Sequence, residues 1–331
     1  MGNCLDFPYI GENVERRDTM ASISIVMPVY NVAPFVAEAI HSCLNQSLPF
    51  DELIVVDDGS NDGTREIVQE FAAMEYRIQM ICTPHNIGPS GSRQFGASQS
   101  RCDYIAFLDG DDWWAPSRLS ELLKIGQSFD ADIICDNAWL VLGTQKTPWT
   151  NMFKDSRYPL SFPKLISYRD FYGFNFGRLH PIVRREFMTM HNIGFSSHIR
   201  YLEHFVFLLH ALDYNARVLV SPTPYYYYRS RPGSMVTSGD TAIQHQREAL
   251  AWARQCSLSP SAQKLLDLMD KQIADGVFWY RCRQEFAKHR YGHLLWLALS
   301  HPHHWAQLVD EIPRSLFRHR LKSRLSVTGN P

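Results

Sequence analysis

Cysteine pairs, long apolar runs and an excess of charge are all missing from this 331-residue sequence. Its seven cysteines include no pair separated by two residues. Neither a zinc knuckle nor a disulfide framework is therefore expected, and the thiols suit a reducing compartment. The longest apolar stretches fall far short of the roughly 20 residues of a membrane-spanning helix. The first 20 residues contain no apolar run, so we expect no signal peptide and a cytoplasmic protein.

The net charge is close to zero, at -1. It gives no general attraction to polyanions, so no nucleic-acid partner is expected. Hydrophobic residues make up 45% of the sequence and charged residues 20%, which is the balance of an ordinary globular protein. The length allows one large domain with an appendage, or two ordinary domains.

Short β-rich runs alternate with helical patterns in the first half of the sequence. This alternation predicts an α/β fold: a Rossmann-like, mostly parallel sheet with flanking helices. Strands are expected at 23–27, 53–56, 77–82, 104–108, 131–135, 216–220 and 225–228. Residues 136–168 lose all periodicity and are expected to form a long functional loop. Beyond residue 240 the pattern is helical almost throughout.

Three of the expected strands end in polar clusters, which parallel strands bring to one edge of a sheet. The clusters are Pro28-Val29-Tyr30-Asn31, Asp57-Asp58-Gly59-Ser60 and Asp109-Gly110-Asp111-Asp112. The three carboxylates of the last cluster repel one another, and oxygen ligands suit Mg²⁺ or Mn²⁺. A solvated acidic turn that caps the next helix is the alternative. The two other polar strand ends favour the metal.

The segment 86–93 contains small residues that run into a helix, and the last residue of this segment is Arg93. Free backbone N–H groups and a nearby guanidinium suit a diphosphate. A plain turn into a helix explains the same residues equally well.

Taken together, these segments resemble a family 2 glycosyltransferase of the GT-A fold. The matching runs are 24–31, 52–64, 86–88 and 104–114, and they cover about residues 22 to 127 in the order and spacing of the family. A looser similarity points to bacterial enzymes that build exopolysaccharide and other cell-surface polysaccharides on a lipid carrier. The resemblance implies a hexosyltransferase that uses a nucleoside-diphosphate sugar, with a UDP-sugar expected.

The resemblance also implies roles for residues at the strand ends. Pro28, Tyr30 and Asp58 would line the nucleotide base, with Asp58 accepting from its imide. Arg93 would face the diphosphate, and Asp109 would approach the ribose.

For the metal, the resemblance implies Asp111 as the principal ligand, with Asp112 in support. It further implies inversion at the anomeric carbon by one direct displacement. Such a step needs charge relief for the departing diphosphate, which a metal supplies, and a general base for the acceptor hydroxyl.

The base of the family usually comes from a Glu-Asp pair that starts a helix, followed after two further residues by an aromatic residue. The counterpart here is Glu203-His204, followed by Phe207. Histidine can serve as a base near neutral pH, so both residues are candidates, with Glu203 ahead of His204. A hydrogen-bonded structural role for His204 is the alternative.

The segment 225–234 resembles the closing strand and arginine-containing loop of the family. Arg229 or Arg231 would then clamp the donor diphosphate. A surface loop with incidental arginines is equally compatible with this segment.

The last part of the sequence is basic, with nine Lys or Arg residues and three acidic residues in 281–331. Amphipathic basic helices can lie on anionic membranes, and a helical cap or a dimer contact is the alternative. We therefore predict a tail at 1–20, a catalytic domain at 21–238 and a helical, basic extension at 239–331. The acceptor is expected to be a glycan or a lipid-linked oligosaccharide at the cytoplasmic face of the inner membrane.

Three other functions compete with this interpretation. A nucleotidyltransferase or a dinucleotide-dependent dehydrogenase needs a Gly-rich loop directly after the first strand, where Pro28-Val29-Tyr30-Asn31 stands instead. A non-catalytic nucleotide-sugar-binding or scaffold protein of the same fold is the stronger rival. His204 at the position of the missing Asp favours that rival, whereas the intact acidic cluster favours an enzyme.

Overall fold

The computed structural model describes residues 21–156, 160–172, 179–231, 239–256, 258–292 and residue 296. The chain forms two compact units that divide between Pro232 and Gly233. The predicted boundary at residue 238 lies outside the described residues. So do the predicted tail at 1–20 and almost all of the basic extension beyond residue 292.

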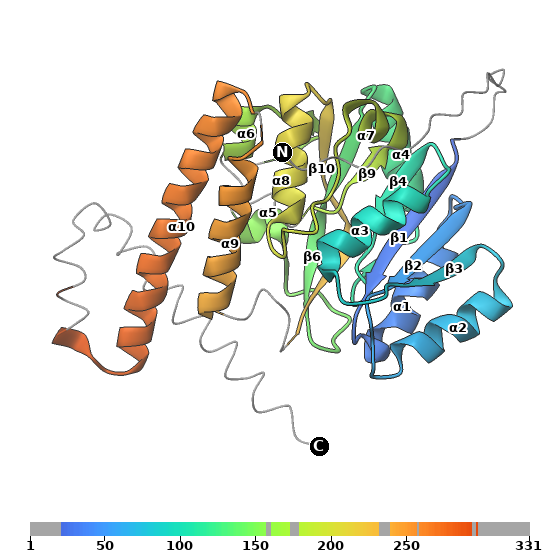
Figure 1. Ribbon diagram of the computed structural model, residues 1–331, viewed down its shortest axis with the longest axis horizontal. Helices are drawn as coiled ribbons and strands as arrows, with labels where there is room; N and C mark the ends of the chain where they lie inside the picture. Colours follow the sequence, from blue (N-terminus) through green and yellow to red (C-terminus); the bar gives the residue numbers. More distant parts are fainter. Residues whose placement is uncertain are drawn as a thin grey trace. The chain divides into compact units, whose positions relative to one another are not determined.

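The first unit is built on one ten-stranded sheet with the order β3-β2-β1-β4-β9-β6-β10-β5 (Figure 1). Its main strands are β1 (Ile23–Val29), β2 (Glu52–Asp57), β3 (Ile78–Cys82), β4 (Tyr104–Phe107), β5 (Trp113–Trp114), β6 (Ile133–Leu142), β9 (Ile182–Arg184) and β10 (Val218–Ser230). Two short strands pair beside this path: β7 (Thr150–Asn151) with β6, and β8 (Lys164–Leu165) with β10. The first four strands are parallel, as are β6 and β10. The predicted α/β fold with a mostly parallel sheet is confirmed.

Helices connect and cover these strands. They are α1 (Ala33–Leu44), α2 (Thr64–Met74), α3 (Gly88–Gln99), α4 (Arg118–Ser128), α5 (Met152–Ser156), α6 (Tyr168–Tyr172), α7 (Arg185–His191) and α8 (Glu203–Asp213). Every residue of β1 is buried, which an apolar strand achieves when both faces of the sheet are covered. Helix α3 lies directly on β1 and β2. A Cβ at Gly96 would lie 2.5 Å from the Cγ1 of Val26, so only glycine permits this close approach.

The prediction of a long loop at 136–168 was wrong. Strand β6 continues to Leu142, and two short strands and a short helix follow before residue 168. Asp136 and Asn137 interrupt the apolar pattern, but both are buried. The partners of their side chains come from elsewhere, since Arg118 binds Asp136 and the carbonyl of Pro222 accepts from Asn137. A local pattern cannot show such partners.

The two strands expected at 216–220 and 225–228 form one strand, β10. Its pairing with β6 shifts in register between Ser221 and Tyr226. This irregularity accommodates Pro222 and Pro224, which lack the N–H group of a regular ladder.

The sequence pattern did not predict β9. With three residues, it is too short for a periodic signal. It lies antiparallel to β4 on one side and to β6 on the other. It thereby joins the β3-β2-β1-β4 half of the sheet to the β6–β10 half.

The second unit contains α9 (Gly239–Ala253) and α10 (Pro260–Ala287), which contact each other. Their described buried side chains include Leu250 and Leu266. Arg254 forms ion pairs with Asp267 and Asp270 at 3.2 and 2.6 Å. Among the described helices of the whole chain, none is long and apolar enough to cross a membrane.

Candidate active site

The three polar strand ends converge at one edge of the sheet, as the topology predicts. The N–H of Asp58 donates to the carbonyl of Val29 at 2.9 Å, and the N–H of Gly110 donates to the carbonyl of Pro28 at 3.3 Å. A Cβ at Gly110 would lie 2.7 Å from the Cγ1 of Val29. The glycine therefore lets the acidic turn lie against the end of β1.

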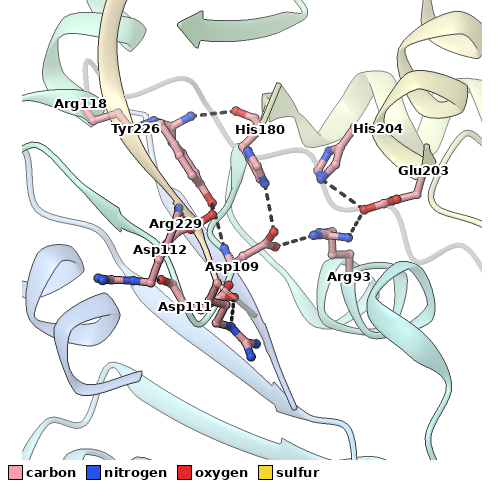
Figure 2. A network of polar contacts seen from close by, with 11 residues as sticks. Arg93, Asp109, Asp111, Asp112, Arg118, His180, Glu203, His204, Tyr226 and Arg229 are labelled. Atoms are coloured by element: carbon pink, nitrogen blue, oxygen red, sulfur yellow. Dashed lines mark hydrogen bonds and ion pairs between the residues drawn. The ribbon is translucent and has the colours of Figure 1, made fainter. Parts of the chain in front are cut away.

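The carboxylate of Asp109 is held from two sides (Figure 2). Arg93 of α3 donates to its Oδ1. The Nε2 of His180, two residues before β9, lies 3.1 Å from its Oδ2. Strand β9 brings His180 here because it pairs with β4, the strand that leads to Asp109.

Strand β10 supplies the partners of the other two carboxylates. The Tyr226 hydroxyl donates to Asp112 at 2.9 Å, and the backbone N–H of Arg229 donates to Asp112 at 2.7 Å. The Nε–H of Arg231 donates to Asp111 at 2.7 Å. Asp112 is buried, whereas the Asp111 side chain is 20% exposed.

Negative charge is unfavourable on two of the three carboxylates of this cluster. Burial, followed by repulsion from neighbouring carboxylates, raises the pKa of Asp112 well above its usual range. Burial and then Asp109 also raise the pKa of Asp111, although Arg231 opposes the shift. Burial acts on Asp109 too, but Arg93 and His180 outweigh it and lower the pKa of that carboxyl.

A divalent cation fits this donor set, since it would relieve the repulsion. Ligand atoms of Asp109, Asp112 and His180 lie within 4.8 Å of one another. This trio differs from the predicted pair, Asp111 and Asp112, because the Asp111 carboxylate contacts Arg231 instead. In the described part of the chain, no other group of three or more His, Cys, Asp and Glu side chains comes as close together.

Arg93 connects the acidic cluster to the predicted base (Figure 2). Its Nη1 donates to the Oε1 of Glu203 at 2.8 Å, while its Nη2 donates to Asp109. The Arg93 side chain is 3% exposed. The guanidinium that was predicted to face a diphosphate thus lies between two carboxylates.

His204 is buried beside Glu203, with its Nε2 3.7 Å from the Glu203 Oε1. Within the described part of the chain, neither ring nitrogen has a hydrogen-bond partner. Burial, then the charges of Arg93 and His180, lower the pKa of His204 well below its usual range, against a smaller opposing effect of Asp109. The imidazole is therefore neutral near pH 7.

Asp58 fixes the segment that leads into α3. Its Oδ1 accepts from the Thr83 hydroxyl and from the N–H of Ile87, and its Oδ2 accepts from the N–H of Gly88, each at 2.8 Å. Two backbone N–H groups of the predicted diphosphate loop are thus engaged by this carboxylate, which caps the N-terminus of α3.

Pro28 and Tyr30 occupy the end of β1. Pro28 lies opposite Val56 of β2 and is buried. The side chain of Tyr30, one residue beyond the strand, is 49% exposed. Of the two, Tyr30 is therefore the side chain that an incoming ligand can cover.

The two arginines at the end of β10 differ in their surroundings. The buried guanidinium of Arg229 donates to the carbonyls of Asp111 and Gly143 and to the Glu38 carboxylate. It also lies over Trp113, 4.5 Å from the ring centre. Arg231 is 23% exposed, and the one hydrogen bond recorded for it in the described part of the chain is to Asp111.

Sequence reasoning missed three residues that support the cluster. Arg118 is fully buried and donates to Asp136 at 2.8 Å and to the His180 carbonyl at 2.7 Å. Tyr226 stacks on the His180 ring, with centroids 4.1 Å apart. For Arg118 the sequence did contain a usable signal: a charged residue next to the apolar face of α4 can indicate a buried ion pair. His180 lay in a segment without a readable pattern, and Tyr226 lay in the strand expected at 225–228, where nothing singled it out from the neighbouring tyrosines.

Comparison with known proteins agrees with this geometry. A family model described as "Glycosyl transferase family 2" matches residues 24–187. The succinoglycan biosynthesis protein ExoO of Rhizobium meliloti is 32% identical over 229 residues, covering 67% of this chain and 65% of ExoO. The uncharacterized glycosyltransferase EpsJ of Bacillus subtilis is 30% identical over 216 residues, which cover 64% of this chain and 62% of EpsJ. The chain thus spans less than two thirds of these relatives.

Two solved structures share the fold. S. aureus TarS in complex with UDP-GlcNAc has a TM-score of 0.61 at 22% identity, covering 76% of this chain and 73% of that one. The mannosyltransferase PcManGT of Pyrobaculum calidifontis, in complex with GDP-Man and Mn²⁺, has a TM-score of 0.57 at 15% identity, covering 92% and 90%. At these identities the likeness establishes the fold alone.

Removing the Arg118 guanidinium should destabilise the protein. We expect Arg118→Met to lower the free energy of unfolding by about 3–5 kcal/mol, because Asp136 would stay buried without its cation. Urea denaturation measures this loss. The double variant Arg118→Met/Asp136→Leu should recover most of it, and a loss below about 1 kcal/mol in the single variant would contradict the buried pair.

Proposed function

Through residues 24–187 the chain belongs to glycosyl transferase family 2, and on this premise we propose that it is an inverting, metal-dependent glycosyltransferase. It moves a sugar from a nucleoside-diphosphate sugar to a glycan or lipid-linked acceptor during synthesis of surface polysaccharide or exopolysaccharide. The observation that carries the proposal is the acidic cluster at the sheet edge, joined to Glu203 by Arg93. The name of ExoO and the UDP-GlcNAc complex of TarS support the acceptor class and a UDP-sugar.

In this proposal Pro28, Tyr30 and Asp58 receive the nucleotide base, and Asp109 approaches the ribose. Exposure of the Tyr30 ring beside the end of β1 supports the first assignment. The Asp58 Oδ2 accepts one recorded hydrogen bond, and an ionised carboxylate oxygen accepts two. Asp58 can therefore hold the loop before α3 and still accept from a base imide.

Asp111 and Asp112 hold the divalent cation, Mg²⁺ or Mn²⁺, with Asp109 and His180 next to them. When bound, the cation neutralises charge on the leaving diphosphate. The raised pKa values of Asp111 and Asp112 support this assignment, since burial and mutual repulsion disfavour their negative charges and a cation would offset both. The Mn²⁺ in the PcManGT complex supports a divalent ion in this fold.

Glu203 accepts the proton of the acceptor hydroxyl as the acceptor oxygen bonds to the anomeric carbon and the bond to the diphosphate breaks. Its place at the first turn of α8 and its hydrogen bond from Arg93 support an oriented carboxylate at this position. His204 is the second candidate for the base. In the same proposal Arg229 or Arg231, at the end of β10, clamps the donor diphosphate.

The transferase can be tested by release of nucleoside diphosphate from UDP-, GDP- and dTDP-sugars with Mn²⁺ or Mg²⁺. We expect release with one donor, its loss with chelator, and about a 10²- to 10³-fold lower rate in Asp111→Asn. Arg254→Gln, in the second unit, serves as a control. Metal-dependent nucleotide binding without turnover across a broad acceptor panel would instead support a non-catalytic binding protein.

The two candidate bases should separate in the same assay. We expect Glu203→Gln to lower kcat by about 10²- to 10⁴-fold, because the amide cannot accept the proton. His204→Phe should lower kcat much less, since a buried neutral ring is replaced by one that also packs against Phe195. The opposite ranking would assign the base to His204.

We further propose that the basic extension contacts the cytoplasmic face of the membrane. Of the nine Lys or Arg residues in 281–331, five lie beyond residue 292 and outside the described part, and the support for the contact is the charge of this segment. The full chain should float with vesicles that contain anionic lipid and not with zwitterionic ones. A triple variant, Arg314→Gln, Arg318→Gln and Arg320→Gln, should float less, and equal flotation would contradict membrane contact.

A further inference from the structure

Two arginines reach the acidic cluster from the end of β10, but only one of them is free to change partners. Arg229 is buried and donates to groups from three separate segments. Arg231 is 23% exposed; its side chain donates a hydrogen bond to Asp111, and its guanidinium lies 5.7 Å from the centre of the Phe35 ring. It also lies one residue beyond the last ladder pair, Ser230 with Leu142. A movement of Arg231 therefore breaks no strand pairing.

The partner of Arg231 is the carboxylate to which we assign the metal. The Arg231 Nε–H donates a hydrogen bond to the Asp111 Oδ2 at 2.7 Å. The Asp111 side chain is itself 20% exposed. A guanidinium and a divalent cation repel each other strongly when both lie beside one partly buried carboxylate. Binding of a cation by Asp111 should therefore expel Arg231.

We propose that Arg231 is an exchangeable counterion. It pairs with Asp111 when the cluster holds no divalent cation, and it moves to the donor diphosphate when a cation binds. This inference rests on the proposed function and extends it. Asp111 keeps one cationic partner in either state, and the diphosphate gains a charge-assisted hydrogen bond only after the cation has bound.

A competing arrangement exists in the same cluster. Asp109, Asp112 and His180 already place ligand atoms within 4.8 Å of one another. A cation bound by that trio would leave the pair of Arg231 with Asp111 intact. The two arrangements therefore make opposite predictions for variants of Arg231 and His180.

Isothermal titration calorimetry distinguishes them, with Mn²⁺ alone, UDP in EDTA, and UDP in saturating Mn²⁺ as the three titrations. Arg231→Gln should bind Mn²⁺ alone about two- to fivefold more tightly, because its competitor is gone. UDP affinity should change less than about twofold in EDTA and fall about tenfold in Mn²⁺, where the freed arginine is missing. Arg254→Gln, which loses an Arg–Asp pair in the second unit, should match wild type throughout.

The outcomes separate this inference from the function on which it rests. Equal losses of UDP affinity with and without Mn²⁺ would mean that Arg231 does not exchange. Unchanged Mn²⁺ affinity in Arg231→Gln, together with its loss in His180→Gln, would place the cation on the trio and overturn the exchange. A wild-type protein that binds neither UDP nor GDP in Mn²⁺ would overturn the proposed function itself.

Discussion

The charge of three neighbouring carboxylates is the constraint on which the rest of the site depends. Asp109, Asp111 and Asp112 follow a buried strand, where ionised groups so close together are costly. The protein offsets this cost with donors that come from α3, from the residues before β9 and from β10. The contacts that stabilise the acidic turn are therefore also the contacts that assemble the site from distant segments.

A row of contacting side chains lies next to this turn (Figure 2). Arg118 lies over the Tyr226 ring, Tyr226 stacks on His180, and His180 lies against His204 at a centroid distance of 4.7 Å. The row links α4, β10 and α8. Because packed interiors transmit small displacements, the position of the acidic cluster and the start of α8 depend on each other.

The departure from the family at His204 acquires a physical meaning in this setting. A buried imidazole without hydrogen-bond partners is a poor substitute for an ionised carboxylate. Glu203, one residue earlier, keeps a carboxylate at the start of the helix, and Arg93 orients it. The same arginine holds Asp109, so the donor side and the acceptor side of the proposed reaction share one charged residue.

The sequence by itself determined the α/β class, the parallel order of the first strands and the meeting of their polar ends. These follow from local periodicity and from the geometry of parallel sheets, which act over a few residues. Only the tertiary structure decided the partners of each carboxylate and the continuation of β6 through Asp136. It also decided the roles of His180, Tyr226 and Arg118 in the cluster. Their partners lie far away along the chain. Burying a charged or polar group is costly unless such a partner offsets the cost, and no local pattern records which partner that is.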